Sequence, residues 1–323
     1  MRAMVITRPG GPEVLAMETR PDPRPSEGDV LVRVSAFGLN QAEVHFRCGE
    51  WPGAQISGIE CVGEVLEDPS RRLATGTRVA ALVGGLARTR NGTYAELVAA
   101  PAANVIALDT SLPWEILAAV PESYATAWCC VNEVLHMRPG ETLVIRGATS
   151  ALGQAALNIA ACAGVRVVAT TRRPERARAL AELGAAKVLS GLGGAEEVCA
   201  LGERPEAVLD LLGTATLIDS CRMVGPGGRV CLAGFLAGGA PLAAFDPVFQ
   251  LPSGVHLATF ASALVLGSPD WPLARIPWTH VLRSVEENRY RARPARVFPF
   301  ADLPAAHALL ESGEAGGKIV VHV

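Results

Sequence analysis

The sequence predicts an α/β protein in which a doubly wound parallel sheet is accompanied by a second, β-rich domain. Two observations lead to this fold class. The first 110 residues read as short strands, and from about residue 120 strands alternate with helices. A chain of 323 residues, half of them hydrophobic and 19% charged, has ample material for two packed cores.

The β-rich part lies at the N-terminal end. Its expected strands are separated by Gly and Pro, which interrupt regular structure. They cover residues 29–40, 60–67, 77–83 and 93–101.

The alternating part follows. Its expected strands are residues 143–148, 165–171, 185–189, 206–213 and 228–234, and its expected helices are 150–164, 174–184, 195–202 and 214–224. The strands are almost continuously apolar, which is typical of a parallel sheet buried on both faces.

After about residue 265 the pattern changes again, to helices at 278–290 and 303–315 and a closing strand at 317–323. We therefore expect residues 120–264 to form a nucleotide-binding domain. Residues 1–119 and 265–323 are expected to form the other domain together.

Composition excludes several classes of partner. The net charge is −3 and no run of Lys or Arg is present, so a nucleic-acid partner is not expected. No apolar stretch reaches the roughly 18 residues of a membrane span, and the first residues lack the apolar core of a leader. The expectation is a cytoplasmic protein that acts on a small molecule.

The segment VIRGATSALGQAALNIA, residues 144–160, runs from a strand through a tight turn into a helix. Dinucleotide-binding proteins place G-x-G-x-x-G at such a turn, and here the three positions are Ala148, Ser150 and Gly153. Ser150 is small and its hydroxyl can donate to a phosphate, while Gly153 allows close packing of the helix. By itself this loop is equally compatible with an ordinary turn between a strand and a helix.

The next strand favours a cofactor site. NAD-binding proteins carry Asp or Glu about 20 residues after the loop, where this chain has Thr171, Arg172 and Arg173. Arginine matches the geometry of a phosphate group, and Arg176 lies close behind. These residues predict the 2′-phosphate of NADPH; the alternative is a solvated helix start.

The whole chain resembles the zinc-independent, quinone oxidoreductase-like (enoyl reductase-like) branch of the medium-chain dehydrogenase/reductase superfamily. The likeness rests on the order and spacing of the opening 43 residues, GTYAEL, PESYATAW, GATSALG, LDLLGTATL, GPGGRVCLAG and AGGKIVV. It implies a GroES-like catalytic domain built from both chain ends, a Rossmann-type domain, and a cleft for NADPH. The cofactor-binding positions implied by the resemblance and the loop are Asn40, Thr126, Ser150, Ala151, Leu152, Gly153, Thr171, Arg172, Arg173, Arg176, Gly234, Phe235 and Lys318.

Zinc is not expected. Zinc-dependent members of the superfamily carry Cys where this chain has Asn40, and Gly-His-Glu where it has Gly58, Ile59 and Glu60. No four-cysteine lobe is present either, and tetrahedral zinc needs three or four ligands at one point. A rebuilt site from His45, Cys48, Glu60 and Cys61 is the alternative.

Without a metal to polarise an alcohol or ketone, the resemblance implies reduction of an activated acceptor, a quinone or an alkene conjugated to a carbonyl or thioester. Relatives place a Tyr where this chain has Trp51, and indole is no useful acid. The candidate catalytic positions are Asn40, Trp51 as a flat pocket wall, and Tyr124. The proton comes from Tyr124, Tyr94 or water, or the substrate needs no acid from the enzyme.

Two other functions stay open. One is a pathway-specific imine reductase or cyclase of secondary metabolism, and the other is an NADPH-binding protein without turnover. The resemblance also implies a homodimer, formed by pairing of the last strands of the Rossmann-type sheet near residues 257–266.

Overall fold

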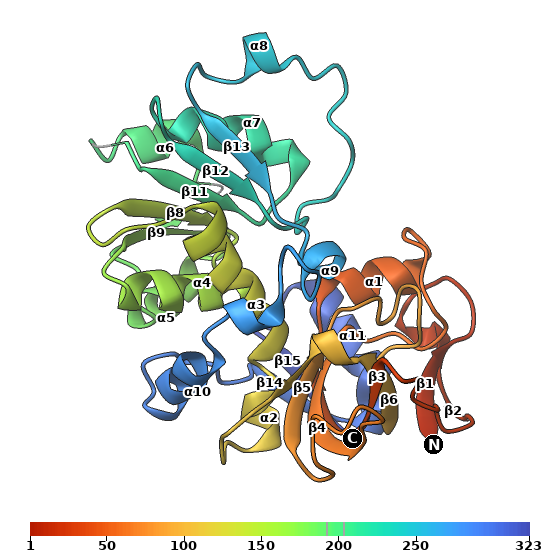
Figure 1. Cartoon of the computed structure of the whole chain (residues 1–323). Coiled ribbons are helices and arrows are strands. Elements are labelled where there is room, and N and C mark those ends of the chain that lie inside the picture. The colour runs from red at the N-terminus through yellow and green to blue at the C-terminus, as the bar shows by residue number, and fades with distance from the viewer. Residues whose placement is uncertain (192, 203) are drawn as a thin grey trace. The chain divides into compact units, whose positions relative to one another are not determined.

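The computed structural model describes residues 1–191, 193–202 and 204–323, which form two compact units (Figure 1). The central unit comprises Thr126–Ala261 and Asn288–Arg291. The terminal unit comprises Met1–Ala125, Ser262–Glu287 and Ala292–Val323. The boundaries thus fall at 125/126 and 261/262, against 119/120 and 264/265 from the sequence. The sequence pattern did not predict that Asn288–Arg291 belongs to the central unit.

The central unit contains a six-stranded, wholly parallel sheet in the order β10-β9-β8-β11-β12-β13. The strands are β8 (Thr142–Arg146), β9 (Arg166–Thr171), β10 (Lys187–Ser190), β11 (Ala207–Asp210), β12 (Arg229–Leu232) and β13 (His256–Thr259). In chain order this is 3-2-1-4-5-6, the doubly wound arrangement, whose order reverses between β8 and β11. The predicted fold class is confirmed.

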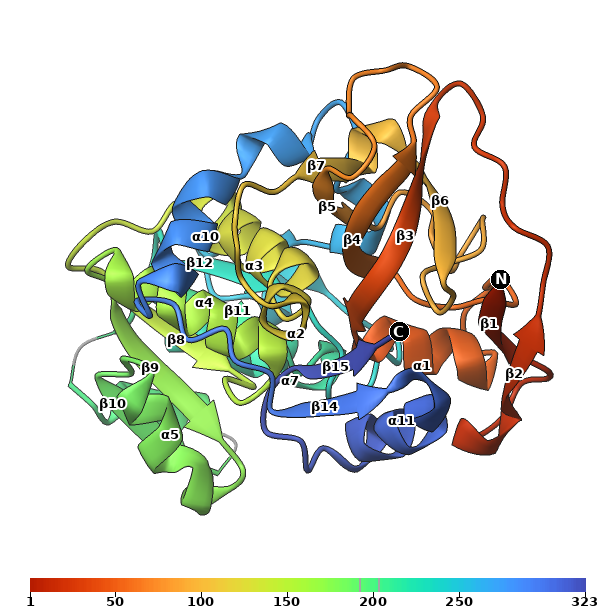
Figure 2. The ribbon, with the colours of Figure 1, turned by 90° about the horizontal axis from the view of Figure 1, so that it is seen from below.

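Helices connect these strands. They are α4 (Ala151–Cys162), α5 (Ala177–Glu182), α6 (Ala195–Cys199) and α7 (Thr214–Met223), followed by the short α8 (Pro247–Gln250). Apolar side chains of the central strands, such as Val144, Val168, Val208 and Val230, are buried under them. Burial on both faces explains why the central strands are mostly apolar. Helix α5 lies beside β10 (Figure 2).

The terminal unit contains a seven-stranded sheet in the order β14-β15-β3-β4-β5-β7, with β6 also paired to β3. The strands are β3 (Asp29–Gly38), β4 (Glu60–Glu67), β5 (Arg78–Leu82), β6 (Leu97–Pro101), β7 (Val105–Ala107), β14 (Arg296–Pro299) and β15 (Ile319–His322). Strand β15 runs antiparallel to β3, with Val320 opposite Gly38. The end of the chain therefore lies against the segment that leads to Asn40.

The terminal unit also contains elements that the sequence patterns did not predict: the hairpin β1 (Arg2–Ile6) and β2 (Leu15–Thr19), strand β14, and helix α1 (Gln41–Cys48). Helix α1 has only eight residues, and Asn40 is its N-cap. The strand predicted for residues 29–40 ends two residues earlier than expected, at Gly38. Its last turn stops at Gly49, whose φ of +76° suits glycine.

Further helices belong wholly or partly to the terminal unit. They are α2 (Trp114–Leu117), α3 (Pro121–Trp128), α10 (Trp278–Glu286) and α11 (Leu303–Ser312). Helix α3 continues into the central unit, and α11 packs against β14 and β15 (Figure 2). The segment predicted to pair between copies, 257–266, contains part of β13 and the short helix α9 (Ser262–Val265).

In the described part of the chain, no helix has the length and the apolar character that crossing a membrane requires.

Candidate functional site

The predicted phosphate loop is the turn between β8 and α4. Gly147 has a φ of +79°, and the hydroxyl of Ser150 donates to the Gly147 carbonyl at 2.9 Å while accepting from the Gly153 N–H at 3.0 Å. Ser150 is therefore the N-cap of α4, and its proton is already used inside the turn. The groups that this turn offers to an anion are the first N–H groups of the helix, at Ala151 and Leu152.

Glycine is required at position 153 because a side chain has no space there. A Cβ at this position would lie 2.6 Å from the carbonyl oxygen of Gly147 and 2.7 Å from the Cα of Ala148. Both are backbone atoms of the loop and cannot rotate away. Gly153 therefore has the packing role that the third glycine of the dinucleotide motif performs.

The two loops at the reversal point are held by buried charged side chains. Asp210, at the end of β11, accepts from the N–H groups of Leu212 at 2.8 Å and Gly213 at 3.2 Å, and from the Ser220 hydroxyl at 2.5 Å. Arg146, the last residue of β8, donates to the same Ser220 hydroxyl at 2.8 Å. These residues fix the carboxyl ends of both strands.

Sequence reasoning missed Arg146 and Asp210. A signal was present, because each is a charged residue at the end of an otherwise apolar strand, in LVIRG and AVLDL. A charge is rarely buried without a partner, so each needed an explanation.

Gly234 and Phe235 follow β12 and lie beside the loop after β11. A Cβ on Gly234 would lie 2.7 Å from the carbonyl oxygen of Leu211, and the N–H of Leu236 donates to that oxygen at 3.0 Å. The structure therefore brings Gly234 and Phe235 to the same edge of the central sheet as the Gly147 turn.

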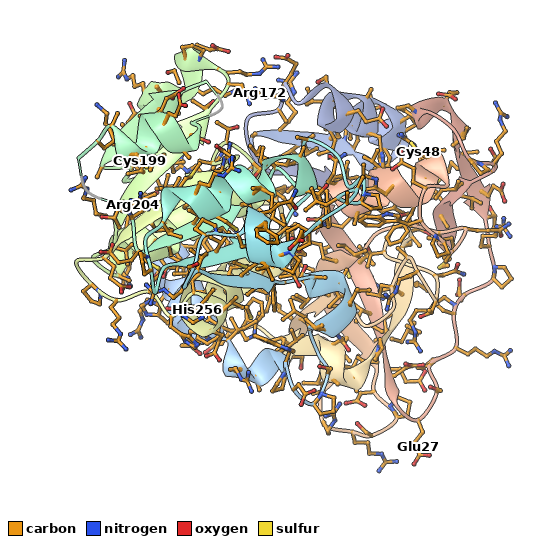
Figure 3. All side chains as sticks on the ribbon, turned by 90° about the horizontal axis from the view of Figure 1, so that it is seen from above. Glu27, Cys48, Arg172, Cys199, Arg204 and His256 are labelled. Atoms are coloured by element: carbon orange, nitrogen blue, oxygen red, sulfur yellow. The ribbon has the colours of Figure 1, made fainter. Side chains whose placement is uncertain are left out.

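The predicted 2′-phosphate residues follow β9. Thr171 is buried at the end of this strand, Arg172 is exposed (Figure 3), and Arg173 and Arg176 are half-buried. Strand β9 is the parallel neighbour of β8, and the N–H of Ala148 donates to the carbonyl of Thr170 at 3.3 Å. The arginines thus emerge at the carboxyl edge of the sheet, next to the turn that begins α4.

The terminal unit contains a compact group of polar side chains that we name the Asn40 cluster: Asn40, Glu43, Glu60 and Lys318. The ammonium of Lys318 donates to Glu60 Oε1 at 2.5 Å and to Asn40 Oδ1 at 2.6 Å. Asn40 Nδ2 donates to Glu60 Oε1 at 2.9 Å. The structure therefore joins two predicted residues, Asn40 and Lys318, through Glu60.

Glu43 holds the start of α1. Its carboxylate accepts from the backbone N–H of Asn40 at 2.5 Å and of Ile59 at 2.9 Å. Burial raises the pKa of this carboxyl from 4.5 to about 7, and the two backbone N–H donors and Lys318 oppose that rise. The spacing Asn40-x-x-Glu43 is that of a capping box, a signal for the start of α1 that the sequence analysis did not use.

A second buried chain of contacts adjoins Glu43. The hydroxyl of Tyr94 lies 3.0 Å from His307 Nε2, and Arg47 Nη1 lies 3.3 Å from His307 Nδ1. Because a guanidinium only donates, Nδ1 must accept and Nε2 must carry the proton towards Tyr94. Burial, followed by the charge of Arg47, lowers the pKa of His307 to about 3, so this imidazole is neutral.

The remaining predicted residues are placed as follows. Trp51 is half-buried and stacks on His45, with ring centroids 4.3 Å apart. Tyr124 and Thr126 are buried on α3. The alternative proton donor, Tyr94, is also buried, and burial, followed by the charge of Glu43, raises its pKa well above 10. A tyrosine with such a pKa is a poor acid at neutral pH.

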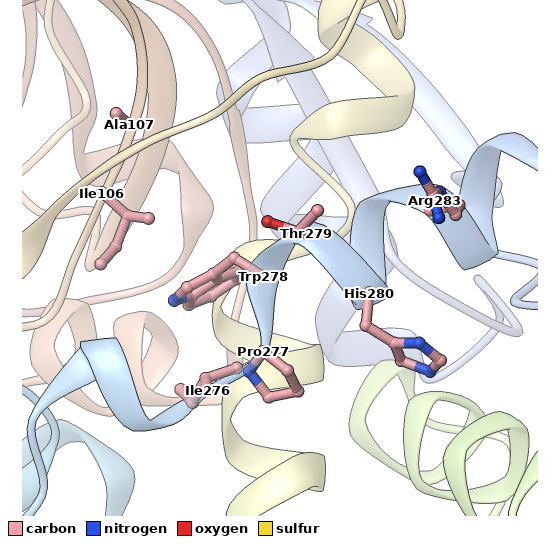
Figure 4. Close-up of a pocket in the computed structure, with 8 residues that line it drawn as sticks. All are labelled: Ile106, Ala107, Ile276, Pro277, Trp278, Thr279, His280 and Arg283. Carbon is pink, nitrogen blue, oxygen red and sulfur yellow. The ribbon is translucent and has the colours of Figure 1, made fainter.

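A cavity of about 590 Å³ also lies within the terminal unit (Figure 4). Its walls are Ile106, Ala107, Arg283 and residues 276–280. It contains none of the predicted site residues, so we do not assign the site to it.

Comparison with known proteins identifies the family. Residues 26–110 match the family described as "Alcohol dehydrogenase GroES-like domain", and residues 151–273 match the one described as "Zinc-binding dehydrogenase". The chain is 30% identical over 238 residues to the quinone oxidoreductase of Pseudomonas aeruginosa, covering 71% of this chain and 72% of that protein.

The chain is also 30% identical over 330 residues to a phenolphthiocerol/phthiocerol polyketide synthase of Mycobacterium tuberculosis. That match covers 98% of this chain, which spans 14% of the length of that protein.

Solved structures of similar proteins have the same fold. A mycobacterial protein in complex with NADPH is 25% identical, with a TM-score of 0.87 and complete coverage of both chains. The CurK enoyl reductase, at 22% identity and a TM-score of 0.83, covers 99% of this chain and 98% of its own, and shows the fold alone. The chain belongs to the medium-chain dehydrogenase/reductase superfamily, in its quinone oxidoreductase-like branch.

Proposed function

We propose that this oxidoreductase uses NADPH to reduce a quinone or an alkene conjugated to a carbonyl or thioester. The observation that carries the proposal is the carboxyl edge of the central sheet. There the N-terminus of α4 and the arginines after β9 emerge from adjacent parallel strands. A pyrophosphate fits the N-terminus of α4, and a 2′-phosphate fits Arg172 and Arg173.

The chain's residues fit this cofactor. The Gly147 turn is held open by its own hydrogen bonds, and glycines at positions 153 and 234 leave no side chain between neighbouring backbones. Bound NADPH would supply the hydride. The protein's part is to bind the phosphates at α4 and Arg172–Arg173, and to orient the nicotinamide end with Asn40.

The residues of the terminal unit at the zinc-binding positions do not suit a metal, which supports an acceptor that can be reduced without one. At the positions where zinc-dependent relatives carry Cys and His, this chain has an amide and the apolar Ile59. The remaining carboxylate, Glu60, is bonded to the ammonium of Lys318 at 2.5 Å. Zinc prefers thiolate, imidazole and free carboxylate ligands, which this group does not offer.

The relatives support two acceptor classes. The Pseudomonas protein is a quinone oxidoreductase, which favours a quinone. The polyketide synthase matches nearly the whole chain, which favours an alkene conjugated to a thioester. Both acceptors receive hydride at an electrophilic carbon without a metal.

The test is an assay of NADPH and NADH oxidation with a simple quinone, an enone and an enoyl thioester. We expect turnover with at least one acceptor, and a preference for NADPH. In the double variant Arg172→Ala/Arg173→Ala, NADPH affinity should fall about tenfold or more while NADH affinity stays the same. Equal losses for both cofactors would refute the 2′-phosphate assignment.

A metal measurement completes the test. Purified protein should contain well under one zinc per chain, and a chelator should not reduce turnover. Stoichiometric zinc that activity requires would reject the proposed chemistry.

A further inference from the structure

The cavity of the terminal unit is lined by strand β7 on one side and by the start of helix α10 on the other (Figure 4). Its volume of about 590 Å³ is within the roughly 300–1,000 Å³ typical of small-molecule pockets. None of its wall residues belongs to the Asn40 cluster or to the predicted cofactor positions. The cavity is therefore a separate feature of this unit.

The two sides of the cavity are held together by packing and by a hydrogen bond. Ile106 of β7 and Leu282 of α10 pack into the same buried hydrophobic cluster. The hydroxyl of Thr110, in the segment after β7, donates to the carboxylate of Glu286, at the end of α10, at 2.5 Å. The cavity therefore has fixed walls, which lowers the entropy cost of binding a ligand between them.

Most of the wall is apolar. Five of the eight wall residues have hydrophobic side chains: Ile106, Ala107, Ile276, Pro277 and Trp278. The indole N–H of Trp278 donates to the carbonyl of Leu273 at 2.9 Å, so the ring offers the cavity only its carbon surface. These walls favour a ligand with an apolar body, because contact with them removes apolar surface from water.

The other three wall residues are polar and exposed, and all come from α10: Thr279, His280 and Arg283 (Figure 4). Thr279 and Arg283 are four residues apart, so they share one face of the helix. Among the described residues, the guanidinium of Arg283 has no hydrogen-bond or ion-pair partner. No acidic residue lines the cavity, and the carboxylate of Glu286 already accepts from Thr110. A cation without a partner thus lies beside apolar walls.

We infer that this cavity binds a small organic carboxylate with an apolar body, such as an aromatic acid. The planar guanidinium of Arg283 matches a carboxylate, and the hydroxyl of Thr279 supplies a second donor on the same face of α10. The body of the ligand lies against Ile106 and Trp278. One permanent cation suits the single charge of a carboxylate better than the two charges of a phosphate ester. The inference does not depend on the reaction with NADPH.

The experiment titrates the whole chain with benzoate and follows the NMR signals of the ligand. We expect the wild type to bind benzoate with a Kd on the order of 1 mM, as suits a ligand of this size. Benzamide has the same shape and no charge, so it should bind about tenfold more weakly or worse. Inorganic phosphate has charge and no apolar body, and it should also bind more weakly than benzoate.

Three variants locate the ligand. Arg283→Met removes the guanidinium, and benzoate affinity should fall about tenfold or more. The matched control is Arg33→Met, which removes an exposed arginine of β3 in the same unit and should leave benzoate affinity unchanged. Both arginines are exposed, so both variants should melt at the wild-type temperature. Ala107→Phe adds a ring to the β7 side of the cavity, where an aromatic residue suits a strand, and should also weaken benzoate.

The outcomes separate the parts of the inference. A loss of benzoate affinity in Arg283→Met, with Arg33→Met at the wild-type value, supports the site. A wild-type chain that does not bind benzoate overturns it, and so does binding that Arg283→Met leaves unchanged, because the ligand then lies elsewhere. Equal affinity for benzoate and benzamide rejects the ion pair. Equal affinity for benzoate and phosphate rejects the apolar wall.

Discussion

The turn before α4 and the Asn40 cluster are built in different ways. The turn is made of backbone groups and small side chains, and its geometry comes from Gly147, Gly153 and the capping hydroxyl of Ser150. The Asn40 cluster is made of side-chain charges, in which Glu60 and Lys318 contact each other directly. A site made of backbone tolerates changes of residue type as long as the chain path is kept. A site made of charges depends on each functional group.

This difference explains the degenerate phosphate motif. Ala148 and Ser150 replace two of the three glycines, yet the turn still leads into α4, whose first N–H groups have no carbonyl partner within the helix. The glycine that was retained, Gly153, is the one whose Cβ would meet backbone atoms.

The largest expected effect is an acid transition governed by His307. Its pKa falls from 6.5 to about 3 in the folded protein, so the neutral form stabilises the fold fully above pH 6.5. As the pH falls towards 3, this contribution is lost, up to about 5 kcal/mol. Urea unfolding at several pH values should show a shallower acid loss for His307→Gln than for wild type. Equal slopes would contradict this.

The next largest effect is due to Glu43, and it changes the folding stability with pH in the opposite direction to His307. Its folded pKa of about 7 exceeds the ordinary 4.5, so the folded protein keeps a proton that the unfolded chain releases. Stability should therefore fall as the pH rises from 4.5 to about 7, by roughly 3 kcal/mol. Glu43→Gln should abolish this slope while retaining one backbone contact. Between pH 4.5 and 6.5 the two residues offset each other in the wild type.

A test of the backbone-built turn is Gly153→Ala. Because the added Cβ meets the Gly147 carbonyl at 2.6 Å, we expect a loss of about 2 kcal/mol in unfolding free energy, together with weaker NADPH binding. The matched control is Gly28→Ala, where no atom lies within 4 Å of the added carbon. Its effect should stay within about 0.5 kcal/mol. Comparable losses in both variants would show that the close contact is unimportant.

The smallest effect is that of Ser150→Ala. Loss of the N-cap should cost about 1 kcal/mol of stability, measured by urea unfolding. NADPH affinity should change by less than about threefold, because the hydroxyl proton is already bonded to the Gly147 carbonyl at 2.9 Å. A large loss of affinity at unchanged stability would restore the direct phosphate contact that the sequence predicted.

The sequence predicted the doubly wound sheet because parallel strands buried on both faces leave a strong apolar pattern. It did not predict α1, because eight residues containing Glu43, His45 and Arg47 give no clear periodicity. It named Asn40 and Lys318 through the family resemblance. Their connection through Glu60 depends on the pairing of β15 with β3, a contact between distant segments that no local pattern reports.

Lys318 lies 258 residues after its partner Glu60, and this separation has a consequence for biosynthesis. While the ribosome is still producing the chain, β3 to β7 are complete long before β15 emerges, and the main part of the central unit ends at residue 261. Domains generally fold as units during synthesis. The central sheet can therefore form first, before the Glu60 carboxylate can pair with the ammonium of Lys318. The charge pair can form only after Lys318 has emerged, when the strands of the central sheet are already complete.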